Sequence, residues 1–328
     1  MLPALLAVVV STSVKPAVAA PRVTIAAVGD VLLGSAVADL VRGEGPDAPF
    51  VAAMPELQRV YAVVGNLECA LSTRGTATAA KPSSAVKKHK EWLLRGSPLA
   101  AKGLKDAGFA ALSLANNHTM DYGPRALLDT IDALGSAGVG AAGAGANVDA
   151  AWQPAFFERA GTRFALLAFS DIVPRGFAAS ASQPGVAVGR SMVSGEVDGA
   201  SIAALRHAVA QARRGADVVI VYEHWGTELK TQPTDAQIRA AHAAIDAGAQ
   251  LVIGAHSHVL GPIERYRDGL IAYSLGNFVF DAFPGPAAQS EILEVTLRGG
   301  VIDSWRAVPI HIWAGVPHID ADASHRSR

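Results

Sequence analysis

Six side chains with the chemistry of metal ligands each follow directly after a short apolar run in this 328-residue chain. The runs are rich in β-branched residues and have the length of strands. Functional groups collect just outside the carboxyl ends of strands in open α/β sheets, so we expect the six to meet in one hollow. They are two carboxylates, one amide and three imidazoles: Asp30, Glu68, Asn117, His224, His256 and His258.

This set of ligands indicates which ions the hollow would take. Oxygen and nitrogen ligands without a thiolate suit Mn, Fe or Zn, whereas Ca²⁺ takes oxygen ligands only. Six ligands are more than one tetrahedral zinc ion needs. The sequence therefore predicts two divalent metal ions that share a carboxylate and activate a water.

Each candidate ligand also has an ordinary structural alternative. Asp30 could cap a helix, Glu68 could be a loop carboxylate, and His224 could be a packed histidine at a strand end. The strongest single signal is His256-Ser257-His258, because two imidazoles two residues apart project to the same side of an extended segment. A metal centre is more economical than six coincidences at six strand ends.

Strands and helices alternate along most of the chain, which is typical of α/β layering. Thr234 is placed to cap the last helix and Gly248 to end it. The strands are predicted at residues 23–28, 61–64, 109–114, 163–169, 218–222 and 251–253. The helices between them are predicted at 98–107, 124–137, 201–214 and 234–247.

The C-terminal third changes character to antiparallel hairpins. One hairpin joins residues 261–267 to 270–275 through an Asp268-Gly269 turn, and the other joins 292–297 to 301–312. Segments 73–90 and 171–199 carry no periodicity and are predicted as irregular loops. We therefore expect one domain over residues 22–313 and a polar tail over 314–328.

The first residues have the pattern of an export signal. An apolar run over residues 2–10 precedes Ala17-Val18-Ala19-Ala20, which predicts a signal peptide of residues 1–19 cut after Ala19. The alternative is an N-terminal core strand, and no basic residue precedes the run, which leaves an upstream start open. No later segment is long and apolar enough to span a bilayer. We expect an extracytoplasmic protein, whether secreted, periplasmic or on the cell surface, with no transmembrane anchor after signal cleavage.

Composition excludes several other classes of protein. The 28 Lys and Arg residues against 29 Asp and Glu residues give a formal charge of -1, so a general nucleic-acid surface is not expected. The single cysteine excludes a disulfide framework and a cysteine-built zinc site.

Six short motifs lie at the ends of the predicted strands. They are VGDVLLG at 28–34, GNLE at 65–68, LANNH at 114–118, HWG at 224–226, GAHSH at 254–258 and SLGNF at 274–278. The chain resembles the CapA family of poly-γ-glutamate capsule biosynthesis, in which these motifs occur in the same order, and the resemblance spans residues 22–283. That family is similar to the calcineurin-like metallophosphoesterases, which implies a four-layer α/β/β/α sandwich with two metals.

The resemblance implies a role for each motif residue. Glu68 would bridge the two metals, and His118 would donate a proton to the leaving group. Leu32 stands where the phosphoesterases have the histidine of Asp-x-His, so the first metal would lose a ligand. The other ligands would be Asp30 and His258 at the first metal and Asn117, His224 and His256 at the second. Four further residues, Asn66, Asn116, Glu228 and Asn277, would line the substrate pocket.

Two functions from different classes follow from this resemblance. The first is a metal-dependent hydrolase that cuts a small phosphoester or an anionic polymer such as poly-γ-glutamate. The alternative is a non-catalytic, polymer-binding component of the capsule synthesis or export machinery. Its candidate cations would be Lys81, Lys87, Lys88 and Lys90 on segment 73–90, although solvated loop charges are an ordinary explanation for them. ATP-driven polymer synthesis by this chain alone is not expected, because no G-x-x-x-x-G-K-[ST] loop occurs in it.

Overall fold

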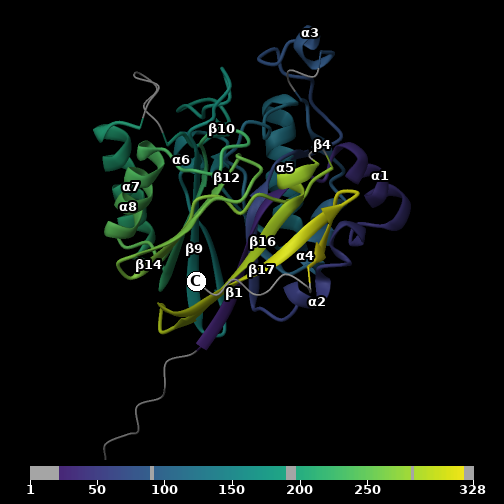
Figure 1. The fold of residues 1–328 in the computed structure, drawn as a ribbon. Coiled ribbons are helices and arrows are strands. Elements are labelled where there is room, and N and C mark those ends of the chain that lie inside the picture. Colours follow the sequence, from purple (N-terminus) through teal and green to yellow (C-terminus); the bar gives the residue numbers. More distant parts are fainter. Residues whose placement is uncertain (1–21, 89–91, 190–196, 282–283, 321–328) are drawn as a thin grey trace, which may run out of the picture.

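The computed structural model describes residues 22–88, 92–189, 197–281 and 284–320. Two β-sheets pack face to face, and helices cover the outer face of each sheet (Figure 1). The four-layer α/β/β/α sandwich predicted from the sequence is confirmed. The predicted signal peptide, Lys90 and residues 321–328 lie outside the described residues.

The first sheet has the order β18-β17-β16-β1-β2-β5-β6, with β15 also paired to β1. Its parallel strands are β1 (Arg22–Val31), β2 (Ala62–Leu67), β5 (Phe109–Ser113), β6 (Gly140–Ala142) and β15 (Asn277–Val279). Its antiparallel strands are β16 (Gln289–Arg298), β17 (Val301–Trp313) and β18 (Val316–Ile319). The outer face is covered by α1 (Ser35–Glu44), α4 (Ala100–Asp106) and α5 (Gly123–Ala137).

The second sheet has the order β13-β14-β12-β11-β9-β8. Four of its strands run parallel: β9 (Thr162–Ser170), β11 (Val218–His224), β12 (Leu251–Ala255) and β14 (Gly269–Ala272). The two edge strands, β8 (Ala155–Arg159) and β13 (Ile263–Tyr266), are antiparallel. Helices α7 (Gly199–Ala212) and α8 (Asp235–Asp246) lie on its outer face, on the left of Figure 1.

Short elements complete the description. They are η1 (Ala48–Phe50), α2 (Met54–Leu57), β3 (Ala70–Leu71), α3 (Ser83–Val86), β4 (Arg95–Gly96), β7 (Ala144–Gly145), α6 (Val148–Ala151), β10 (Gly185–Val186) and η2 (Gly285–Ala288). Within the described part of the chain, no helix combines the length and apolarity needed to cross a bilayer.

Strand alternation builds the core between the two sheets. In β11, Val218, Ile220 and Tyr222 face the opposite sheet, while Val219 and Val221 face the helices. This two-residue period is the geometry of a strand buried on both faces. The same period turns the last residue of β11, His224, towards the space between the sheets.

The four predicted helices are confirmed as α4, α5, α7 and α8, with boundaries within two residues of those expected. Helix α8 begins with a capping box, in which the Thr234 hydroxyl accepts from the Gln237 backbone and the Gln237 side chain accepts from the Thr234 backbone. Gly248, with φ +109°, follows the end of the helix, as the sequence indicated.

Two predictions for the C-terminal third need correction. The first hairpin forms, but Gly269 pairs with Tyr266, so the turn is Arg267-Asp268 and Arg267 takes the left-handed φ of +50°. Residues 316–319, expected in a polar tail, form β18 instead. Ala314 and Gly315 both have positive φ and reverse the chain, so β18 pairs with β17. The second predicted hairpin is confirmed as β16–β17.

One glycine in β1 is required by close approach of another backbone. A Cβ added at Gly29 would lie 1.9 Å from the carbonyl oxygen of Gly276. We expect Gly29→Ala to lower the free energy of unfolding by about 1–3 kcal/mol, measured by urea denaturation. The matched control is Gly43→Ala in α1, where an added Cβ meets nothing within 4 Å and should stabilise by about 0.5–1 kcal/mol. Equal stability of the Gly29 variant and the wild type would contradict the packing argument.

Candidate metal centre

Asp30 is positioned by a register shift in β1. The predicted strand ended at residue 28, but β1 continues to Val31 because β15 provides a second pairing partner. The pairing of β1 with β2 shifts between Ala27 and Asp30. Asp30 therefore lies opposite Asn66 on β2 and opposite Asn277 on β15.

The Asp30 carboxylate is fully buried and oriented by two donors. Asn66 Nδ2 donates to Oδ1 at 2.8 Å, and the backbone N–H of His256 donates to Oδ2 at 3.1 Å. Burial raises the pKa of Asp30, against the opposing attraction of His258. A carboxylate with two such donors keeps further lone pairs that are available to a cation.

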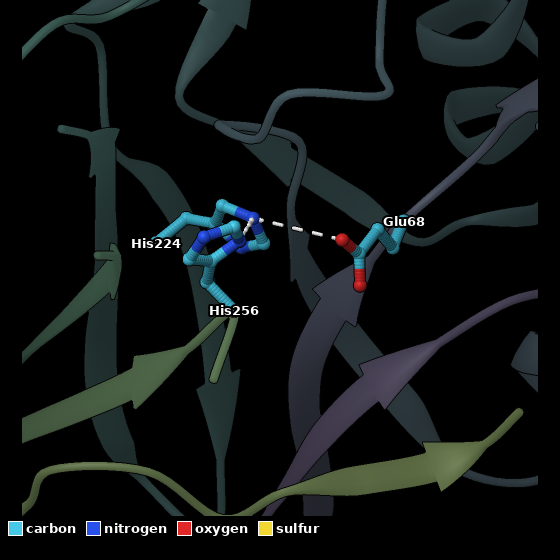
Figure 2. Close-up of side chains that lie close together, drawn as sticks. All are labelled: Glu68, His224 and His256. Carbon is cyan, nitrogen blue, oxygen red and sulfur yellow. Dashed lines mark hydrogen bonds and ion pairs between the residues drawn. The ribbon is translucent and has the colours of Figure 1, made fainter. Parts of the chain in front are cut away.

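Glu68 follows β2 directly and is buried without a hydrogen bond to either carboxylate oxygen among the described residues. The His224 Nε2 atom lies 3.6 Å from its Oε1 atom, and Figure 2 shows the carboxylate directed towards His224 and His256. Burial raises the pKa of Glu68 well above its ordinary value, and the charge of Asp30 adds to the increase. A buried carboxylate in this state is costly unless a cation compensates it.

Three side chains face Glu68 from the second sheet and from the turn after β5. His224 Nε2 lies 2.8 Å from Asn117 Oδ1 and 3.1 Å from His256 Nδ1. Burial lowers the pKa of His224 well below its ordinary value and lowers that of His256 to about 3. Both imidazoles are therefore neutral near pH 7, the form that binds metals.

His258 contacts both Asp30 and Asn277. Its Nδ1 atom lies 2.8 Å from Asn277 Oδ1 and 3.5 Å from Asp30 Oδ2. Asn277 Nδ2 donates to the carbonyl of Ala287, so its oxygen faces the ring and the His258 Nδ1 atom carries the proton. In the neutral ring, Nε2 is then the nitrogen with the lone pair that binds a metal.

The backbone of the H-x-H segment is not extended, contrary to expectation. His256 has φ +91° and His258 has φ +58°, conformations that are uncommon for residues other than glycine. The turn directs the two rings to different partners, His256 to His224 and His258 to Asn277. Strain of this kind clusters at functional sites, where the surrounding structure holds it.

The ligand atoms form two groups that share one carboxylate. Glu68, His224 and His256 offer ligand atoms within 4.8 Å of one another, and so do Asp30, Glu68 and His258. All five residues are buried. The donors are carboxylate oxygen and imidazole nitrogen without thiolate, so the residues fit Mn, Fe or Zn.

His118 lies beside these groups and is bound by a residue that the sequence reasoning missed. Its Nδ1 atom is 2.7 Å from Asp121 Oδ2, and burial lowers its pKa while Asp121 opposes the decrease. A carboxylate three residues after a candidate catalytic histidine was a signal that could have found Asp121. Lys81, which also contacts Asp121, carried no such signal, because it looked like one lysine among several in a loop.

Two asparagines expected to line the pocket, Asn66 and Asn116, form hydrogen bonds with neighbouring residues of the site. Asn116 donates to Asn66 Oδ1 and to the carbonyl of Leu67, and its oxygen accepts from the backbone of His118 and from Thr119. Its hydrogen-bonding capacity is used within the protein. Asn66 is likewise buried. It donates to Asp30 and accepts from Asn116, so this pair of asparagines orients the Asp30 carboxylate.

The other two expected pocket residues differ in their exposure to solvent. Glu228 is exposed in the turn after β11. Its negative charge raises the pKa of Glu68 further, although less than burial and the charge of Asp30 do. Asn277 is buried and holds His258. Glu228 is thus the one of the four predicted pocket residues that is exposed to solvent.

The sandwich and the shared carboxylate define an α/β protein with a candidate two-cation centre at its strand ends. The chain belongs to the bacterial capsule synthesis protein family PGA_cap, whose model matches residues 24–282. The CapA resemblance noted from the motifs is confirmed by this match and by the relatives below.

Two curated relatives are similar over most of this chain. The capsule biosynthesis protein CapA of Bacillus anthracis is 32% identical over 309 residues, which cover 94% of this chain and 72% of that protein. The PGA biosynthesis protein CapA of Bacillus subtilis (strain 168) is 32% identical over 291 residues, covering 88% and 72%. A crystal structure of a hypothetical protein from Thermus thermophilus has a TM-score of 0.51 at 17% identity, covering 87% of this chain and 98% of that one. This last likeness supports the fold alone.

Proposed function

We propose that this protein is an exported, metal-dependent hydrolase of the cell envelope. Its substrate would be an anionic polymer or a phosphoester formed during poly-γ-glutamate capsule biosynthesis. The relatives named for capsule and PGA biosynthesis support the biological setting. The predicted signal peptide supports export.

The observation that carries the proposal is the state of Glu68. It is fully buried, has no hydrogen bond to either oxygen among the described residues, and belongs to both ligand groups. An uncompensated carboxylate in this place is unfavourable, whereas a divalent cation on each side would neutralise it. The neighbouring imidazoles are neutral, which is the form of histidine that binds a divalent cation.

The residues divide between two cations. Glu68 with Asn117, His224 and His256 would hold one, and Glu68 with Asp30 and His258 the other. Bound divalent cations would supply Lewis-acid polarisation of the scissile group and lower the pKa of water towards neutrality.

His118 would donate a proton to the leaving group. Asp121 holds its Nδ1 atom, so Nε2 is the nitrogen that can face a substrate. A histidine in this state donates a proton from Nε2 when charged and accepts one when neutral. Asp121 therefore plays the part of the orienting carboxylate.

The two cation sites are expected to differ in affinity. The site with Asp30 has three protein donors, because Leu32 is buried in the outer core between the first sheet and its helices. The other site has four. Titration of the chelated protein with Mn²⁺ should show two steps separated by about tenfold or more in dissociation constant. A single step with one ion per chain would contradict the two-site assignment.

The alternative, a polymer-binding component without catalysis, loses one of its candidate cations. Lys81 is buried and ion-paired, so it is not available to a polymer. Lys87 and Lys88 are exposed and retain the charge that such a role would need. Under this alternative, replacing both by Met should weaken poly-γ-glutamate binding, while His256→Ala should leave the binding intact.

The deciding experiment combines metal content with turnover. The protein isolated from its own compartment should contain Mn, Fe or Zn by elemental analysis. It should hydrolyse phosphodiesters or poly-γ-glutamate, and His256→Ala should abolish this turnover. His207→Ala, on the exposed side of α7, is the matched control. A metal-free protein that stays inert with added Mn²⁺ or Zn²⁺ would overturn the proposal.

A further inference from the structure

A lysine ammonium group is buried beside the candidate proton donor. Lys81 is 3% exposed, and its Nζ atom forms an ion pair with Asp121 Oδ1 at 2.7 Å, where Asp121 is fully buried. Nζ also donates to the carbonyl oxygens of Asn117 at 2.8 Å and Trp92 at 3.2 Å. Burying a lysine is expensive, so a buried lysine with this many partners needs an explanation.

The lysine holds three separate segments of the chain together. Its own segment precedes α3, Trp92 precedes β4, and Asn117 and Asp121 lie in the turn between β5 and α5. Asp121 Oδ2 also accepts from the backbone N–H of Leu94 at 2.7 Å. Lys81 and Asp121 together therefore define where this turn lies relative to the rest of the site.

The geometry also decides which nitrogen of His118 carries the proton. Nδ1 faces both Asp121 Oδ2 at 2.7 Å and Lys81 Nζ at 3.0 Å. Two acceptors would repel one another at 2.7 Å, so a proton lies between Nδ1 and the carboxylate. Lys81 then acts on the histidine through Asp121 and through the carbonyl of Asn117, the residue before it.

We infer that Lys81 is a positioning residue of the proposed hydrolase, which sets the location of His118 and of Asn117 by binding Asp121 and the Asn117 carbonyl. This inference rests on the proposed function for its catalytic consequence. Its structural consequence, a fixed His118 side chain and a fixed cation ligand, can be measured without turnover. Lys81 touches neither of the two ligand groups through a side-chain ligand atom, so its effect passes through the residues that it holds.

The test compares Lys81→Met with Lys102→Met, a lysine on α4 whose side chain is exposed. Lys81→Met should lower kcat by about 10–100-fold with KM within about twofold, the range typical of residues that orient a ligand shell. It should also weaken Mn²⁺ binding at the Asn117 site, measured with Mn²⁺ alone. The His118 Nδ1–H proton, followed by NMR in the metal-free protein, should exchange with water at least about tenfold faster. Lys102→Met should change none of these.

A second variant covers the case in which Lys81→Met does not fold. Lys81→Ala should regain Mn²⁺ affinity and slow exchange of the His118 proton when propylammonium is added, but not with 1-propanol, because the ammonium donors are needed. The inference is overturned if either variant, without added amine, keeps the Mn²⁺ affinity of the wild type and its rate of exchange of the His118 Nδ1–H proton. If the wild type is inert on every substrate, the proposed function fails, while the Mn²⁺ and NMR measurements still decide the role of Lys81.

Discussion

Glu68→Gln is expected to lose both bound cations together and to lower turnover by at least about 10³-fold. The residue belongs to both ligand groups, so removing its charge weakens each of them. The Lewis-acid contribution of several kcal/mol disappears with the ions. Elemental analysis and kcat on the same preparation measure the effect. Loss of only one ion, with the other retained at full occupancy, would contradict the bridging assignment.

The same substitution should reverse its effect on stability when metal is removed. In chelated protein the Glu68 carboxylate is buried without a hydrogen bond to either oxygen among the described residues, so Gln should stabilise the fold by about 1–3 kcal/mol. With Mn²⁺ at a thousandfold excess over its dissociation constant, the wild type gains about 4.1 kcal/mol that the variant does not. Thermal melts with and without chelator should therefore rank the two proteins in opposite orders.

The pH dependence of the stability of the metal-free protein independently tests whether Glu68 is a buried carboxylate. Its folded-state pKa is raised above the ordinary value of 4.5, so the folded state binds more protons than the unfolded state above that pH. The Glu68 contribution to stability therefore falls as pH rises from about 4.5, and the advantage of Glu68→Gln should grow over the same range. Urea denaturation of both chelated proteins at several pH values measures this difference. An advantage that is constant with pH would contradict the buried-carboxylate argument.

The buried imidazoles make stability depend on pH in the opposite direction to Glu68. Burial lowers the pKa of His256 to about 3, so the unfolded state binds the additional proton below its ordinary value of 6.5. Stability from this group is present above pH 6.5 and is lost as pH falls towards 3. His224 acts in the same direction. These contributions are common to the wild type and Glu68→Gln, so the comparison between the two isolates the carboxylate.

His118→Asn is expected to lower turnover by about 10²–10⁴-fold with metal content unchanged. The proposed role is proton donation to the leaving group, and that step contributes this range in enzymes that use it. The loss should be large for alkyl phosphoesters and small for p-nitrophenyl esters, since a good leaving group needs no proton. The exposed His207→Asn in α7 should have no effect. An equal loss on both kinds of ester would remove His118 from the donor role.

Much of the architecture could be read from the amino-acid sequence because it depends on local patterns. Short apolar runs rich in β-branched residues predicted strands of both sheets, and the Thr234 and Gly248 signals bounded α8. Residue types at strand ends also indicated which side chains would meet. Parallel strands bring their carboxyl ends to one edge, so residues far apart in sequence, such as His224 at the end of β11 and His256 after β12, become neighbours.

What only the tertiary structure decided depends on contacts between segments. The shift that carries β1 past Asp30 requires β15, which comes almost 250 residues later in the chain. The left-handed turn at His256 is stabilised by a bond from its backbone to Asp30, and no local propensity favours it. The sequence indicated a solvated charge at Lys81, but this side chain is buried and paired with Asp121. No local pattern could show this, because Asp121 lies on a different loop. Side-chain type is local, but the burial and pairing of a charge belong to the whole fold, and this is why the candidate ligands were found while Asp121 and the burial of Lys81 were missed.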